Sequence, residues 1–254
     1  PNTTFSGVMS STGSFTKVGS GTLTLSGPNT YTGTTTISAG TLSLTGTGSI
    51  ASSSSIINNA SFDISGTTSG ASIISLSGNS SGSTVLGSKT LTITAGADTF
   101  AGVISGTNGN LTIAGGTQVL SGINTYTGTT TISAGTLNIT GALSDSTAIL
   151  INSGATYIVG ANDTVGSIAN AGNITLSANL TTGNVTDTTF SGVISGAGNL
   201  TKVGSGTLTL SGNNTYTGTT TVSAGTLSVV GAVSTGAILT VNNGATYVVA
   251  VDGT

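Results

Sequence analysis

The sequence predicts an all-β fold, a parallel β-solenoid of about thirteen coils with 18–20 residues in each coil. Three observations predict it. Long segments of the chain repeat, apolar residues recur every 19 or 20 residues inside each repeat, and strand-forming Val, Ile and Thr dominate the composition together with turn-forming Gly and Asn. We expect residues 1–254 to form a single continuous solenoid with no helices of note, built from modules that start near residues 5, 100 and 190, the last of them truncated.

The repeated modules are the first of these observations. Residues 5–46 and 190–231 align without a gap over 42 positions and differ at nine of them. A middle copy, residues 100–141, contains one inserted and one deleted residue and ends in NTYTGTTTISAGTLNITG. A second element, INSGATYIVG at 151–160, returns as VNNGATYVVA at 241–250. Self-similarity of this kind is the sequence signature of a repeat architecture.

The shorter period inside each module predicts the coils. The apolar residues that centre the predicted strands are spaced by 19 or 20 residues, in the series Leu23, Leu42, Phe62; Leu208, Leu227, Tyr247; and Leu137, Tyr157, Leu176. Segments such as TLTLS (22–26) alternate polar and apolar residues, as a strand with one buried face does. The predicted core therefore contains Leu23, Leu25, Leu42, Leu44, Leu137, Leu208, Leu210 and Leu227.

The composition excludes several classes of protein. Only 4% of the 254 residues are charged, against about 25% in typical soluble domains. The cations are Lys17, Lys89 and Lys202, the acids are all aspartates, and Arg, Glu, His and Cys are absent. We therefore expect no nucleic-acid partner, no cofactor, no disulfide and no metal site. The low net charge of −3 and the many β-branched residues also argue against disorder.

The segment FSGVISGAGNLTKVGSGTLTLSGNNTYTGTTTVSAGTLSVVG resembles the autotransporter-associated β-strand repeats, also called passenger-associated transport repeats. The resemblance covers nearly the whole chain and is strongest at residues 5–46, 100–164 and 187–250. It implies a right-handed parallel β-helix that is exported to the surface of a Gram-negative cell and anchored by a C-terminal translocator barrel in the outer membrane. That barrel and a signal peptide are not recognisable here, and the chain opens at Pro1 without Met, so we expect a piece of a longer parent protein.

An enzyme on the same scaffold is the alternative, because parallel β-helices also carry polysaccharide lyases and hydrolases. Glycoside hydrolysis needs two carboxylates within about 5–10 Å of each other. No two of the six aspartates lie within ten residues of each other, so a pair could form only between coils: Asp63, Asp98, Asp145, Asp163, Asp187 and Asp252. We interpret Asp98 and Asp187 as turn residues and predict no catalytic residue.

The lysines offer little more chemistry. Lys17 and Lys202 are equivalent by alignment, but Ile113 takes their place in the middle copy. A residue that one copy lacks is more typical of a solvent-exposed side chain on a coil than of a catalytic residue. We therefore interpret Lys17 and Lys202 as solvent-exposed side chains.

Tyr31, Tyr126 and Tyr216 recur once per module in NTYTG, so they are candidates for surface contact with glycans or proteins. The alternative, which we favour, is that each ring fills a gap between coils, with the preceding Asn bonded to backbone groups of a corner. Threonine arrays also occur, as in ice-binding solenoids. Because the TLT motif appears at most once per module, ice binding is not favoured.

These observations predict a non-enzymatic structural or adhesive rod or fibre segment of a Gram-negative surface protein. Its expected partners are a protein or glycan on a host or neighbouring cell and, head to tail, other copies of itself. The alternatives are a carbohydrate-active enzyme or a glycan-binding module on the same scaffold.

Overall fold

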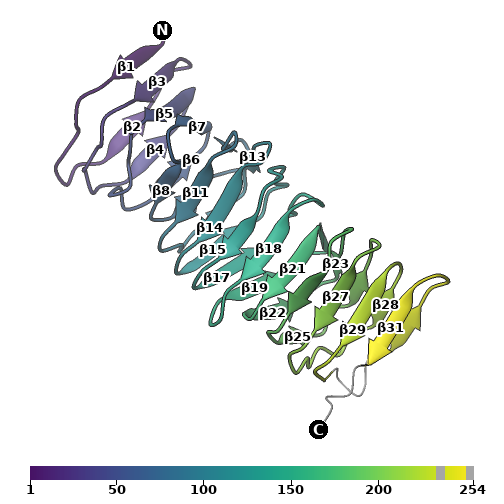
Figure 1. Ribbon diagram of the computed structural model, residues 1–254. Coiled ribbons are helices and arrows are strands. Elements are labelled where there is room, and N and C mark those ends of the chain that lie inside the picture. The colour runs from purple at the N-terminus through teal and green to yellow at the C-terminus, as the bar shows by residue number, and fades with distance from the viewer. Residues whose placement is uncertain (233–237, 250–254) are drawn as a thin grey trace. The chain divides into compact units, whose positions relative to one another are not determined.

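Figure 1 shows a computed structural model of the chain, which describes residues 1–232 and 238–249. Within these residues there are strands, turns and bends but no helix, and the strands build a parallel β-solenoid of about twelve turns. The chain divides into two compact units, Pro1–Thr130 and Thr131–Thr254. The all-β solenoid predicted from the sequence is confirmed, whereas the continuity of the whole chain as one solenoid stays a prediction.

The first unit, coloured purple to teal in Figure 1, has three stacks of hydrogen-bonded parallel strands, which we call ranks, and one further strand pair. One rank is β1 (Thr3–Phe5), β3 (Thr22–Leu25), β5 (Thr41–Gly46), β7 (Ser61–Thr67), β10 (Ser83–Val85) and β13 (Val103–Ser105). A second is β2 (Phe15–Lys17), β4 (Thr35–Ile37), β6 (Ile56–Asn58) and β9 (Leu76–Ser77). A third is β8 (Ala71–Ile73), β11 (Thr90–Ile93) and β14 (Asn110–Ile113), and β12 (Thr99–Phe100) pairs with β15 (Thr117–Leu120).

The second unit repeats the arrangement in the green-to-yellow part of Figure 1. One rank is β17 (Thr136–Ile139), β19 (Thr156–Val159), β22 (Asn173–Leu176) and β25 (Ile194–Gly196). A second is β18 (Ala148–Ile151), β21 (Ser167–Asn170), β24 (Thr188–Phe190), β27 (Thr207–Leu210), β29 (Thr226–Val229) and β31 (Thr246–Val249). The third is β20 (Asp163–Val165), β23 (Leu180–Thr182), β26 (Leu200–Lys202), β28 (Thr220–Val222) and β30 (Leu239–Val241). Strand β16 (Thr130–Ile132) contains the boundary between the units.

The register confirms two of the three predicted series of apolar residues. Leu23 pairs with Leu42, which pairs with Phe62, and Leu208, Leu227 and Tyr247 follow one another in the same way. The third series is wrong at its last member, because Tyr157 pairs with Ile174 while Leu176 pairs with Val159. This coil is shorter than the period predicts, since the single residue Gly166 joins β20 to β21.

The core is a column of inward-facing Leu, Ile, Val and aromatic side chains. Seven of the eight leucines predicted for it are buried: Leu25, Leu42, Leu44, Leu137, Leu208, Leu210 and Leu227. Leu23 is only half-buried, because it borders a surface hollow that Pro1, Thr3 and Phe15 also line. Burial of such side chains stabilises a fold by about 1.5–3 kcal/mol each.

Glycines at one corner of the second unit let neighbouring coils approach closely. A methyl group on Gly192 would lie 1.6 Å from the carbonyl oxygen of Gly172, and one on Gly212 would lie 1.9 Å from that of Gly192. The repetition of SG in each module therefore has a steric cause, because any side chain at this corner would push two coils apart.

Candidate functional site

The asparagine of each NTYTG motif fastens one corner of a coil to its neighbours. Asn29 Oδ1 accepts the backbone N–H of Met9 at 2.9 Å, and Asn29 Nδ2 donates to the carbonyls of Gly27 at 2.9 Å and Ser49 at 3.1 Å. Asn124 and Asn214 accept backbone N–H groups twenty residues earlier in the same manner. These residues are buried, and the predicted bonds between them and corner backbone groups are confirmed.

The recurrent tyrosines lie inside the solenoid. Tyr31 is 3% exposed, and Tyr126 and Tyr216 are fully buried. The Tyr31 hydroxyl bonds to the Thr35 hydroxyl at 2.6 Å, and the other two tyrosines form the same bond to the threonine four residues on. The tyrosines are therefore not surface contacts, and the favoured interpretation of them as rings inside the solenoid is confirmed. The rings fill the gap between coils, and burial raises the pKa of Tyr31 and Tyr216 although the threonine bonds act in the opposite direction.

Lys17 and Lys202 are also buried, so the prediction that their side chains are exposed to solvent is wrong. Lys202 is 1% exposed, and its Nζ donates to the carbonyls of Val203, Gly204 and Ala224 at 2.6, 2.9 and 3.3 Å. Three carbonyls thus satisfy the three N–H groups of the ammonium, which makes the buried charge tolerable. Burial lowers the pKa of Lys202, and the negative charge of Asp187 partly offsets this.

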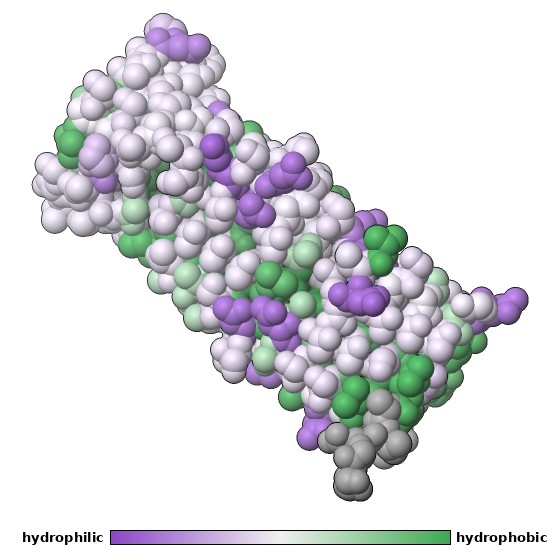
Figure 2. All heavy atoms as spheres, viewed as in Figure 1, coloured by the Kyte–Doolittle hydropathy of each residue, from purple (hydrophilic) through white to green (hydrophobic). Residues whose placement is uncertain are grey.

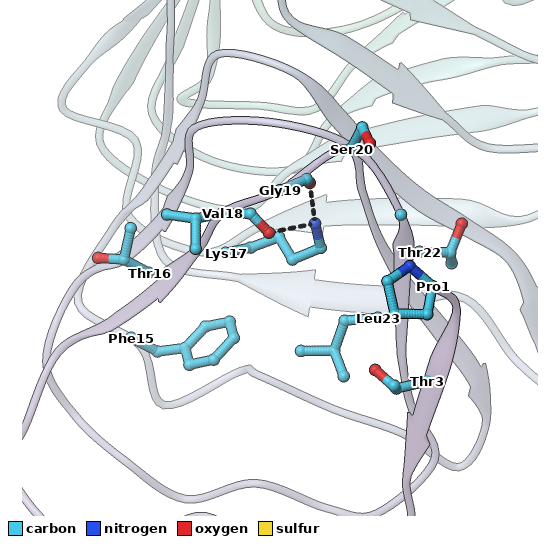
Figure 3. Close-up of a pocket in the computed structure, with 11 residues that line it drawn as sticks. Pro1, Thr3, Phe15, Thr16, Lys17, Val18, Gly19, Ser20, Thr22 and Leu23 are labelled. Atoms are coloured by element: carbon cyan, nitrogen blue, oxygen red, sulfur yellow. Dashed lines mark hydrogen bonds between the residues drawn. The ribbon is translucent and has the colours of Figure 1, made fainter.

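Lys17 forms the equivalent cage with the carbonyls of Val18, Gly19 and Ala39 at 2.9, 2.6 and 3.0 Å. Figure 3 shows its amino group turned towards the first two of these carbonyls, beneath the corner that they form. The middle copy has the fully buried Ile113 at this position. Each of these positions faces the interior, so an apolar side chain can replace the caged lysine.

Asp163 is the one aspartate among the described residues that is buried, at 6% exposure. Its Oδ1 accepts the N–H groups of Leu143 and Thr164, both at 3.1 Å, and its Oδ2 accepts the Tyr157 hydroxyl at 3.1 Å. Burial raises the pKa of Asp163 from its usual 3.8 to about 6; the three hydrogen bonds lower it, and nearby Asp145 raises it slightly. The bond to Leu143 spans twenty residues, as do the bonds of the module asparagines, so Asp163 occupies an asparagine-type corner.

The other described aspartates accept hydrogen bonds from backbone or side-chain groups of the coils, or face solvent. Asp187 Oδ1 accepts the N–H of Thr207 on the next coil at 2.7 Å, Asp63 Oδ1 accepts that of Ser65 at 2.8 Å, and Asp98 Oδ2 accepts the Ser55 hydroxyl at 3.0 Å. Asp145 is exposed, and Asp252 lies outside the described residues. Among residues 1–232 and 238–249, no three potential metal ligands come together.

Two surface hollows of the first unit were candidate binding sites. The larger, about 430 Å³, lies between Phe15 and Leu23, whose side chains face each other across it in Figure 3. The other, about 360 Å³, is bordered by residues 46–49, 51 and 68–72, which are Gly, Ala, Ser and Thr. Neither is lined by an aspartate, so neither offers the pair of carboxylates that glycoside hydrolysis needs. Most of the surface visible in Figure 2 has intermediate hydropathy, in keeping with this composition.

Three comparisons with known proteins complete the description. Residues 15–44, 115–139 and 200–229 match the family model of the passenger-associated-transport-repeat. The matched segments contain the buried residues Lys17, Lys202, Tyr31, Tyr126 and Tyr216. The family model therefore covers the buried corners described above. A search of the curated proteins and a search of the solved structures found no match. No helix within the described part of the chain is long and apolar enough to cross a membrane.

Proposed function

We propose that this chain acts as a structural or adhesive segment on the surface of a Gram-negative cell. The proposal starts from its passenger-associated-transport-repeats, which imply an autotransporter passenger domain on a β-solenoid. The observation that supports this most is that its recurrent polar residues stabilise the solenoid itself. The asparagines, tyrosines and caged lysines that repeat between modules all bond within or between coils. They build the scaffold, and the outward positions left to meet a partner are mainly Ser, Thr and Asn.

The proposed partner is a protein or glycan on a host or neighbouring cell. Beads coated with the purified chain should adhere to such cells in proportion to the amount of protein on the bead. Beads coated with the Leu208→Asp variant, whose core would hold an unpaired charge, should not adhere. Equal adhesion of both would contradict a role for the folded solenoid.

An enzyme on the same scaffold would behave differently. Incubation of the chain with a panel of bacterial and plant polysaccharides should release neither reducing ends nor unsaturated products. Release of either, retained after Lys202→Met and lost after substitution of an exposed aspartate, would contradict the proposal and favour a carbohydrate-active enzyme.

Self-association is a further part of the proposal. Parallel pairing of strands from successive coils holds each unit together, and the same pairing can join the coils of two chains head to tail. Sedimentation velocity over a hundredfold range of protein concentration should show a growing fraction of larger species. A single monomeric species throughout would contradict the fibre role.

A further inference from the structure

The outer face of the third rank in the second unit carries a threonine on five successive coils. Thr164 pairs with Thr181, Thr181 with Thr201, Thr201 with Thr221, and Thr221 with Thr240. Each is the central residue of a three-residue strand whose neighbours on β20, β23, β26 and β28 are buried or nearly so. The side chains of all five threonines therefore point outward in one line, half-buried or exposed.

A second line of polar side chains runs parallel to the threonines, two residues earlier on each coil. It contains Asn162, Asn179, Asn199 and Thr219, followed by Ile238. Each asparagine is fixed to the next coil, because the side-chain oxygens of Asn162, Asn179 and Asn199 accept the backbone N–H of Asn179, Asn199 and Thr219 at 3.0, 3.1 and 2.7 Å. The two lines form an N-x-T grid in which the asparagine side chains cannot shift independently of the coils.

This grid could not be recognised from motifs along the sequence. The outward threonines come from four different contexts, NDT, NLT, TTT and ILT, and only the register brings them into line. The TLT motifs of the sequence lie on other ranks.

The grid is also free of charge. The two ionisable residues of these strands, Asp163 and Lys202, both point into the solenoid, where hydrogen bonds satisfy them. The face presents hydroxyl, methyl and amide groups, with the aliphatic side chain of Ile238 at its last coil. A charged ligand would find no complementary group on it.

We infer that this N-x-T grid is an ice-binding face. Neighbouring strands of a sheet lie about 4.8 Å apart, so each line of the grid repeats at about this distance. The asparagine line directly precedes the strands, and extended backbone would separate it from the threonine line by about 6.6 Å. Oxygen atoms on the prism faces of hexagonal ice repeat at a similar pair of distances and carry no net charge. A neutral grid of hydroxyl and methyl groups on a fixed backbone, beside asparagines already bonded to the next coil, can therefore hold water in an ice-like arrangement at a small cost in side-chain ordering.

The neutral alternative, a polysaccharide, is less well matched. Sugar rings are commonly bound against exposed aromatic rings. In the second unit Tyr157, Tyr216 and Phe190 are fully buried, and the described half-buried ring of Tyr247 lies on β31 in another rank. The grid thus offers hydrogen bonds without the aromatic surface on which a pyranose stacks.

The first unit supplies a matched control. On β2, β4, β6 and β9 the corresponding outward residues are Thr16, Thr36, Ile57 and Ser77, so the threonine line stops after two coils. Thr36 lies in the sequence TGTTTIS and Thr221 in TGTTTVS, so the two share nearly identical local surroundings. Substitution of either should affect folding equally but only Thr221 belongs to the grid.

The test is uptake of the whole, fluorescently labelled chain into slowly growing ice, together with the shape of single ice crystals in its presence. We expect the wild-type chain and Thr36→Tyr to enter the ice and to facet the crystals. Thr221→Tyr should fall to the level of serum albumin, with an unchanged circular dichroism spectrum. If the tyrosine variant is misfolded, Thr201→Lys tests the same face on another coil, with a charged side chain that can extend into solvent.

Three results would overturn the inference: a wild-type chain that ice excludes as it excludes albumin, equal loss for Thr36→Tyr and Thr221→Tyr, or uptake by crystalline cellulose or chitin with none by ice. None of these results bears on adhesion to cells, so the ice-binding face and the proposed function can fail separately.

Discussion

Asp163→Asn replaces the buried carboxylate by the amide that occupies equivalent corners elsewhere in the chain. Asn29, Asn124 and Asn214 each accept a backbone N–H twenty residues earlier, as Asp163 accepts that of Leu143. The amide oxygen of an asparagine can keep this bond, and the Tyr157 hydroxyl can accept from the new N–H group. The substitution should therefore retain the corner while removing its titration.

The size of the effect follows from the two pKa values. Burial raises the pKa of Asp163 from 3.8 to about 6, so between these pH values the folded protein holds a proton that the unfolded chain has released. The free energy of unfolding therefore falls as the pH rises through this range and is level above it. A pKa difference of about 2 corresponds to a loss of about 3 kcal/mol, and the carboxylate is too deeply buried for solvent to screen much of it.

Urea denaturation followed by circular dichroism, from about pH 3.5 to 7.5, measures this loss. The wild-type midpoint should fall with rising pH, whereas the Asp163→Asn midpoint should fall less and lie higher at neutral pH. Asp145→Asn, which removes an exposed carboxylate near the same corner, should keep the wild-type fall. Parallel curves for wild type and Asp163→Asn would refute the reasoning, because they would show that the corner carboxylate is as easily ionised in the folded chain as in the unfolded one.

Three further substitutions test the scaffold. Lys202→Met should lower the free energy of unfolding by about 1–3 kcal/mol for the carbonyls left without a donor, while Lys89→Met, at a half-exposed lysine, should change it by less than about 0.5 kcal/mol. Gly192→Ala should destabilise the second unit by several kcal/mol through separation of two coils, whereas Gly13→Ala, which meets no atom within 4 Å, should be nearly neutral in a thermal melt. Leu208→Asp should abolish the β-type circular dichroism spectrum, because it places an unpaired charge in the core, and a native spectrum would contradict the inward assignment of this residue.

The sequence predicts the coils well because apolar residues recur along it at nearly the length of one coil. Leu23, Leu42 and Phe62 follow the predicted spacing, and the register of the structure pairs them in that order. The prediction failed where a turn was shorter than average, since Tyr157 pairs with Ile174 instead of Leu176. Periodicity gives the mean length of a coil, whereas the length of one coil depends on its own turns, here the single Gly166 between two strands.

The buried polar corners were harder to predict. A lysine followed by VGSG and, about twenty residues on, by SAG gives no sign that its ammonium lies among carbonyls, because neither segment carries a charge. The tyrosines were ambiguous for a similar reason, since a ring with a hydroxyl suits a wet surface and a bonded interior equally. The missing information for the lysines was the pairing of coils, which brings Ala39 to Lys17. For the tyrosines it was the path of the turn within one coil, which brings Thr35 to Tyr31.

Repetition in this chain therefore indicates structure more than recognition. The residues that recur between modules, Asn29, Tyr31 and Lys17 among them, are held by bonds within and between coils, so any coil that keeps the same corner must keep the same residues. A specific surface has to come from positions where the modules differ or from the coils between them. The N-x-T grid fits this expectation, because Thr164 and Thr181 lie outside the matched repeats while Thr201 and Thr221 lie inside them. Coils of different sequence complete a regular face that no single repeat contains.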